Sequence, residues 1–256
     1  MIGKTRACLA AAAVIASLSA PGLRAQETVP AARNLKVAVY TDTGATAGGE
    51  KVLSVLAGFS DVKMDRFTAA DIRAGRLAGY DVLLHPGGTG GGQGKALGEE
   101  GRQKVREFVR GGGGFVGICA GAYLASCDYP WSLHILDAKV IDKAHWARGN
   151  GDVQVALTPA GKSLLGAETD RQQIAYFQGP LLTPAGDPDV PDYEKLGTFE
   201  TEIALKGASK GVMIGTTAIA SGSFGAGHVL CFSPHPEKTP GKEPLLHQGL
   251  RWVARR

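Results

Sequence analysis

The chain has 256 residues, of which 44% are hydrophobic and 20% are charged. This composition is typical of a globular protein and excludes a disordered chain or an integral membrane protein. The formal net charge is +4, but removing Lys4, Arg6 and Arg24 with an N-terminal signal would leave 25 of the 28 basic residues against 24 acidic ones. Because this balance is nearly neutral and no basic run is present, the sequence does not indicate a nucleic-acid partner.

The first 25 residues resemble a signal peptide, since basic residues precede a short apolar run and Ala25 offers a small residue for cleavage. We therefore expect a periplasmic or secreted protein, with residues 26–33 as a linker. The apolar run, Leu9 to Leu18, is shorter than the roughly 20 residues of a membrane-spanning helix. We expect no stable membrane insertion after cleavage, and an uncleaved anchor is the alternative.

Apolar runs and helical spacing predict alternating strands and helices in the first half of the chain. The predicted strands are residues 35–40, 61–67, 81–84 and 114–118, and the predicted helices are residues 50–59 and 95–110. This alternation is typical of an α/β protein with a parallel sheet covered on both faces. The second half predicts inserted strands at 133–141, 151–157, 171–177 and 196–205, a hairpin of 212–220 and 228–232 turning at 221–225, and a helix at 244–253. We predict one domain, residues 34–256.

The sharpest motif surrounds Cys119, which ends a buried strand and precedes a helix in the order Gly117-Ile118-Cys119-Ala120-Gly121. Small residues on both sides allow strand and helix to approach closely, and such a turn holds a nucleophile exposed. The helix N-terminus favours a thiolate, and the N–H of Ala120 would face an oxyanion. The alternative is a buried structural cysteine beside a glycine-rich turn.

Two further motifs support a catalytic cysteine. His235 and Glu237 follow an apolar strand in Ser233-Pro234-His235-Pro236-Glu237, at the sheet edge where ligand sites gather. His235 could take the thiol proton while Glu237 orients the imidazole; an exposed loop histidine is the alternative. In His85-Pro86-Gly87-Gly88, Gly88, with Gly87 as a substitute, could supply a second oxyanion donor.

In this order, the three motifs resemble the class I glutamine amidotransferase-like superfamily over about residues 35–255. The resemblance implies a flavodoxin-like, doubly wound, mostly parallel sheet with helices on both faces, and a triad of Cys119, His235 and Glu237. The sequence is most similar to the N-terminal domain family of biotin-protein ligases in its stand-alone bacterial form, through residues 117–126, 146–151 and 176–180. We expect no ligase activity, because no ligase catalytic domain is evident.

Other residues are weaker candidates. Arg148 could hold a substrate carboxylate or pair with a structural acid, and Tyr176 and Gln178 could line a pocket or simply end a strand. Cys127 and Cys231 could form a disulfide, which would leave Cys119 as the free thiol.

We expect no cofactor and no metal. Gly112 to Gly117 spells a dinucleotide fingerprint but enters a strand instead of following one. Thr89 to Ala96 imitates a phosphate loop but lacks its first glycine and its metal-binding hydroxyl. The six histidines show no paired ligand spacing.

The sequence therefore predicts an exported cysteine hydrolase that acts through an acyl-enzyme intermediate. Its substrate would be a small-molecule or peptide amide, namely a glutamine-like, γ-glutamyl or peptide amide. A non-enzymatic ligand-binding module with the same fold is the main alternative. A thiol-based chaperone, deglycase or peptidase ranks lower, because that branch usually lacks the C-terminal His-x-Glu.

Overall fold

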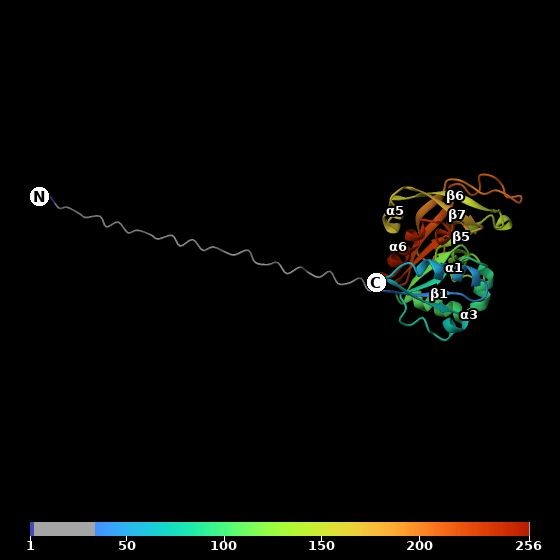
Figure 1. Cartoon of the computed structure of the whole chain (residues 1–256), viewed down its shortest axis with the longest axis horizontal. Helices are drawn as coiled ribbons and strands as arrows, with labels where there is room; N and C mark the ends of the chain where they lie inside the picture. The colour runs from blue at the N-terminus through green and yellow to red at the C-terminus, as the bar shows by residue number, and fades with distance from the viewer. Residues whose placement is uncertain (3–33, 256) are drawn as a thin grey trace. The chain divides into compact units, whose positions relative to one another are not determined.

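Five strands form the parallel centre of one sheet in the computed structural model, which describes residues 1–2 and 34–255. The strands pair in the order β2-β1-β3-β4-β11 (Figure 1). Their bounds are β1 Leu35–Tyr40, β2 Val62–Phe67, β3 Val82–His85, β4 Gly114–Ile118 and β11 Gly227–Phe232. β3 and β4 are buried throughout, as expected for parallel strands covered on both faces.

Helices cover both faces of this centre, which confirms the predicted α/β fold. Val37 and Val39 of β1 join a core cluster that includes Leu56 of α1, whereas Ala38 and Tyr40 join a second cluster with Leu97 of α3. Successive residues of a strand point to opposite faces, so the two clusters lie on opposite sides of the sheet. The helices are α1 Thr46–Leu56, α2 Ala69–Arg73, α3 Gly90–Arg110, α4 Ala120–Ala125, α5 Pro159–Leu165 and α6 Glu243–Val253.

The second half extends the sheet with antiparallel strands, so the sheet is mixed around a parallel core. From β11 the order continues β10-β9-β6-β7, and β8 pairs with β10 and with β5. These strands are β5 Ala138–Ile141, β6 Asn150–Leu157, β7 Arg171–Phe177, β8 Leu181–Pro184, β9 Glu194–Phe199 and β10 Thr217–Phe224.

Several predicted boundaries are wrong. The hairpin does not turn at 221–225: β10 continues to Phe224, which pairs with Gly227, so the turn is Gly225-Ala226. Gly225 supplies the positive φ of 62° that this tight turn uses. The predicted strands 133–141 and 196–205 shrink to β5 and β9, and α2, α5 and β8 were not predicted.

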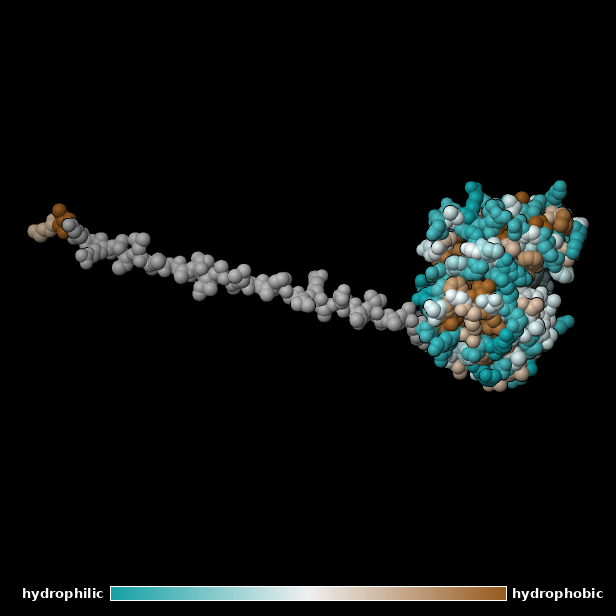
Figure 2. Space-filling view, viewed as in Figure 1, coloured by the Kyte–Doolittle hydropathy of each residue, from teal (hydrophilic) through white to brown (hydrophobic). Residues whose placement is uncertain are grey.

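The expected signal peptide and the linker at 26–33 lie outside the described residues. Among the residues that the structure describes, no helix has both the length and the apolar character needed to cross a bilayer. The face of the domain seen in Figure 2 is largely hydrophilic around one gathered apolar area.

Candidate active site

Cys119 lies between the end of β4 and the start of α4 in a conformation that is rare for a residue with a side chain. Its φ is 52° and its ψ is −99°, which is strained backbone for a non-glycine residue. The turn is held because the N–H of Cys119 donates to the carbonyl of Phe232 at 2.8 Å. The side chain is buried, with 6% exposure, and faces the end of the sheet where β3, β4 and β11 stop.

The glycines beside Cys119 are required by close packing. A Cβ on Gly117 would lie 2.5 Å from the carbonyl oxygen of Gly121, and a Cβ on Gly121 would lie 2.0 Å from that of His85. Both distances are impossible for a carbon atom against backbone. The Gly-x-Cys-x-Gly spacing therefore lets β3, β4 and α4 meet around the cysteine.

His235 and Glu237 form a buried pair just past β11. Nδ1 of His235 donates to Oε1 of Glu237 at 2.6 Å, and both residues are 1% exposed. Burial by itself lowers the pKa of His235, but the thiol of Cys119 and the carboxylate of Glu237 outweigh it and raise that pKa to about 9. The imidazole is therefore held as a cation near neutral pH.

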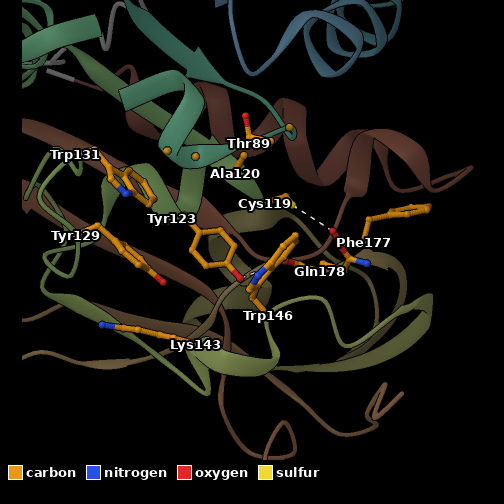
Figure 3. A pocket seen from close by; sticks show the side chains of 13 residues that line it. Thr89, Cys119, Ala120, Tyr123, Tyr129, Trp131, Lys143, Trp146, Phe177 and Gln178 are labelled. Atoms are coloured by element: carbon orange, nitrogen blue, oxygen red, sulfur yellow. Dashed lines mark hydrogen bonds between the residues drawn. The ribbon is translucent and has the colours of Figure 1, made fainter. Parts of the chain in front are cut away.

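The thiol of Cys119 lies close enough to the His235 imidazole to raise its pKa, but its hydrogen bond is made to a backbone carbonyl. Sγ of Cys119 donates to the carbonyl of Phe177 at 3.5 Å (Figure 3). Nε2 of His235 has no hydrogen-bond partner among the described residues.

Cys119 opens onto a pocket of about 330 Å³ whose lining includes Gly88 and Ala120. Ala120 is the first residue of α4, and the first N–H groups of a helix have no partner within it. Both predicted oxyanion donors thus share the cavity with the sulfur. Gly87 is not among the lining residues; it lies against the His235 ring, where its added Cβ would stand 2.6 Å from Cε1.

Of the three predicted substrate-binding residues, the structure places Gln178 alone in this pocket. Arg148 is buried and pairs through Nη2 with Oδ2 of Asp142 at 2.8 Å, which is the structural alternative stated above. Tyr176 is also buried, and its hydroxyl donates to the carbonyl of Gly179 at 2.8 Å. Neither side chain is among the residues that line the pocket.

The sequence reasoning missed most of the pocket wall. Most of the missed residues are aromatic or basic, namely Tyr123, Tyr129, Trp131, Trp146, Phe177 and Lys143, and the others are Thr89, Gly90 and Gly91 at the start of α3. A signal was present: three of them fall within nine positions, 123–131, directly after the nucleophile turn, in a chain that is 7% aromatic.

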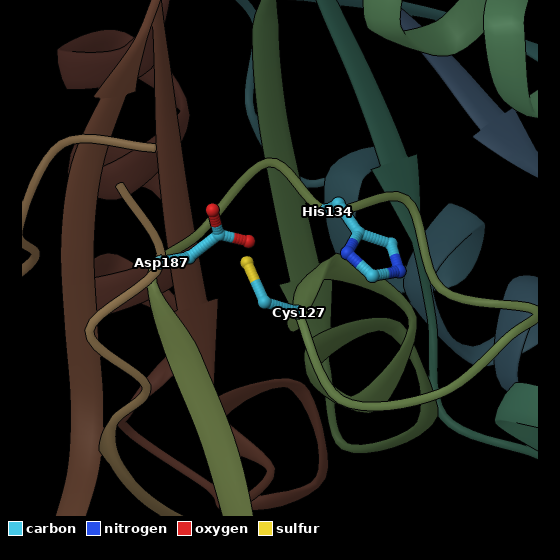
Figure 4. Close-up of side chains that lie close together, drawn as sticks. All are labelled: Cys127, His134 and Asp187. Atoms are coloured by element: carbon cyan, nitrogen blue, oxygen red, sulfur yellow. The ribbon is translucent and has the colours of Figure 1, made fainter. Parts of the chain in front are cut away.

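Three donor groups outside the pocket could hold a metal ion. Ligand atoms of Cys127, His134 and Asp187 lie within 4.8 Å of one another (Figure 4). Their present partners are protein groups, since the Cys127 thiol donates to the carbonyl of Leu136 at 3.1 Å and Nε2 of His134 lies 3.2 Å from that of Tyr129. Cys119, Cys127 and Cys231 are all free thiols, so the disulfide considered from the sequence is not formed.

Comparison with known proteins supports the fold. Residues 35–147 match the family described as biotin-protein ligase, N terminal. Among solved structures, a glutamine amidotransferase shares 20% identity and a TM-score of 0.58, covering 85% of this chain and 98% of its own. PurLQS from Thermotoga maritima shares 14% identity and a TM-score of 0.64, and the match covers 86% of this chain and 99% of that chain. A cytoplasmic protein from Salmonella typhimurium shares 14% identity and a TM-score of 0.54, and the match covers 87% of this chain and 100% of that chain. No curated protein matches significantly.

Proposed function

We propose that this chain, which matches the biotin-protein ligase N-terminal family over residues 35–147 and has a fold like that of glutamine amidotransferases, is an exported cysteine hydrolase of an amide. The observation that carries the proposal is the buried His235–Glu237 pair, with its 2.6 Å hydrogen bond, beside a cysteine on a strained turn. Strain and buried charge of this kind concentrate at functional sites.

The first half of the reaction forms a thioester. The Cys119 thiolate attacks the amide carbon, and the N–H groups of Ala120 and Gly88 stabilise the negative oxygen. As the C–N bond breaks, Nε2 of the protonated His235 gives its proton to the leaving nitrogen. Glu237 keeps the other ring nitrogen protonated and so fixes which nitrogen exchanges the proton.

The second half releases the acid. A water molecule attacks the thioester carbon while His235 takes one of its protons. The C–S bond then breaks, the thiolate returns and a carboxylic acid leaves. Export favours this free hydrolysis over delivery of ammonia to a partner enzyme, since the segment before residue 34 has the features of a signal peptide.

Selective alkylation tests whether Cys119 is activated. Burial raises the pKa of Cys127 to about 12 and also raises that of Cys231, so both serve as unreactive internal controls. Iodoacetamide at pH 7, followed by peptide mass mapping, should label Cys119 quickly and stoichiometrically. In folded His235→Ala protein the labelling should slow at least about tenfold. Equal rates in both proteins would contradict an activated thiolate.

A non-enzymatic binding module remains the second candidate. It is favoured by one observation, namely that the thiol bonds to the Phe177 carbonyl instead of to His235. Turnover of a panel of γ-glutamyl, peptide and simple amides, compared between wild type and Cys119→Ala, separates the two functions. A binding module predicts no difference across the panel, whereas the hydrolase predicts activity in the wild type alone.

A further inference from the structure

Aromatic rings dominate the pocket beside Cys119. Five of its lining residues are aromatic, and Figure 3 shows their rings following one another from Trp131 and Tyr129 past Tyr123 to Trp146. Trp146 is 56% exposed, so its ring is accessible to a ligand. The wall therefore offers a continuous aromatic surface to an incoming group.

The position of Trp131 is fixed by the glycine-rich start of α3. A Cβ on Gly90 would lie 3.0 Å from Cη2 of the indole, and a Cβ on Gly94 would lie 2.3 Å from the Trp131 carbonyl oxygen. This is the segment that imitates a phosphate loop in the sequence. Its glycines make room for an indole, so the wall is preorganised and loses little entropy when a ligand binds.

A second ring rigidifies the first. Tyr129 stacks on Trp131 with ring centroids 4.5 Å apart and an interplanar angle of 14°. Lys143 places its Nζ 5.0 Å from the centre of the Tyr129 ring on which it rests. The three side chains form one packed unit at the pocket wall.

The residues that line the pocket offer no unpaired charge to a free amino acid. Lys143 is the sole charged residue among the lining residues that the structure describes, and its Nζ already pairs with Asp128 at 2.7 Å. Arg148, the other nearby cation, pairs with Asp142 outside the lining. The α-ammonium and α-carboxylate of glutamine would each lose water here without gaining a counter-ion, which is costly.

We propose that the substrate is the amide of an acid carrying a flat, uncharged aromatic group, seated against Trp131 and Tyr129, and that glutamine is a poor substrate. This inference rests on the proposed hydrolase function. Because Tyr129 and Trp131 already stack on each other and Lys143 lies over Tyr129, the group contacts the parts of these rings that line the pocket. Burial and ring contacts there supply binding energy and hold the carbonyl near Cys119 throughout both halves of the reaction.

The test has a kinetic arm and a binding arm. Benzamide, phenylacetamide, 3-phenylpropanamide and 4-phenylbutanamide vary the distance between ring and carbonyl, and glutamine is the comparison. We expect kcat/KM of the best aromatic amide to exceed that of glutamine by at least about a hundredfold, and Trp131→Ala to lower it at least about tenfold. Trp252→Ala removes a tryptophan that packs in a tilted arrangement against His228 instead and is the matched control. Calorimetry with inactive Cys119→Ser protein measures binding alone.

The outcomes separate the two proposals. Faster hydrolysis of glutamine than of every aromatic amide would overturn the aromatic substrate and leave the hydrolase standing. The aromatic substrate would also be overturned, with the hydrolase still standing, if Trp131→Ala changed neither binding nor selectivity. If no amide is hydrolysed, yet Cys119→Ser binds a phenylalkanamide and Cys119→Ser with Trp131→Ala does not, the pocket assignment stands and the hydrolase fails. If neither turnover nor binding is observed, the hydrolase proposal and the aromatic-substrate proposal are both overturned.

Discussion

Gly87 and His235 are in direct contact: a Cβ added to the glycine would stand 2.6 Å from Cε1 of the imidazole. The two glycines of the turn after β3 therefore have different roles, which the sequence alone does not distinguish. Gly88 lies in the pocket beside Cys119, whereas Gly87 closes the space behind the ring. Since the ring also bonds to Glu237, it is constrained from two sides.

Gly87→Ala is expected to displace the His235 ring and abolish most activity. A misplacement of about 1 Å commonly costs about a hundredfold in rate, so kcat should fall by at least that factor. Thermal unfolding should show a stability loss of about 1–3 kcal/mol at most, from overpacking. Unchanged kcat in folded Gly87→Ala protein would refute the contact's importance.

Glu237→Gln should shift the pH dependence of the reaction. The Glu237 carboxylate is one of the groups that raise the pKa of His235 to about 9, so replacing it with a neutral amide lowers that pKa. The imidazolium that acts as the acid is then deprotonated at a lower pH than in the wild type. The alkaline limb of the kcat/KM profile therefore shifts to lower pH. A pH–rate profile of both proteins measures this, and an unmoved limb would show that the carboxylate does not act through His235.

The same pKa predicts a stability trend. Because the folded-state pKa of His235 lies above the ordinary value near 6.5, protonation of this residue stabilises the fold fully below about pH 6.5. That contribution is lost as the pH rises through about 9. Urea unfolding of wild type and His235→Gln from pH 6 to 10 should show a difference that shrinks across this window; a difference that grows would contradict the raised pKa.

Arg148→Met is expected to destabilise the fold without removing a substrate contact. Arg148 is 1% exposed and its partner Asp142 is 13% exposed, so breaking the pair should cost about 3 kcal/mol. Arg171→Met breaks a comparable pair with Glu200, but Arg171 is 73% exposed, and the cost should be below about 1 kcal/mol.

Urea unfolding of both variants checks the difference. The rate at which iodoacetamide labels Cys119 should stay near that of wild type in each folded variant. A selective rise in KM for Arg148→Met at unchanged stability would instead return this arginine to the substrate.

The alternation of strands and helices and the turn at Cys119 could be predicted because they depend on local signals: apolar runs, and glycines at fixed spacing. The positions of Trp131 and Tyr129 could not, because they depend on glycines about forty residues away at the start of α3. Arg148 was ambiguous for a related reason. A lone arginine in a sequence does not show whether its partner is a ligand or Asp142, and that is decided by tertiary packing.

The proposed hydrolase forms a covalent acyl intermediate on Cys119. The most direct measurement is the intact mass of wild-type protein, quenched in acid during turnover of a phenylalkanamide, with peptide mapping of the added mass. We expect the mass of the acyl group on Cys119, with Cys127 and Cys231 unmodified, and no adduct or turnover in Cys119→Ala. Turnover that persists in Cys119→Ala, or an adduct on another cysteine, would contradict the account.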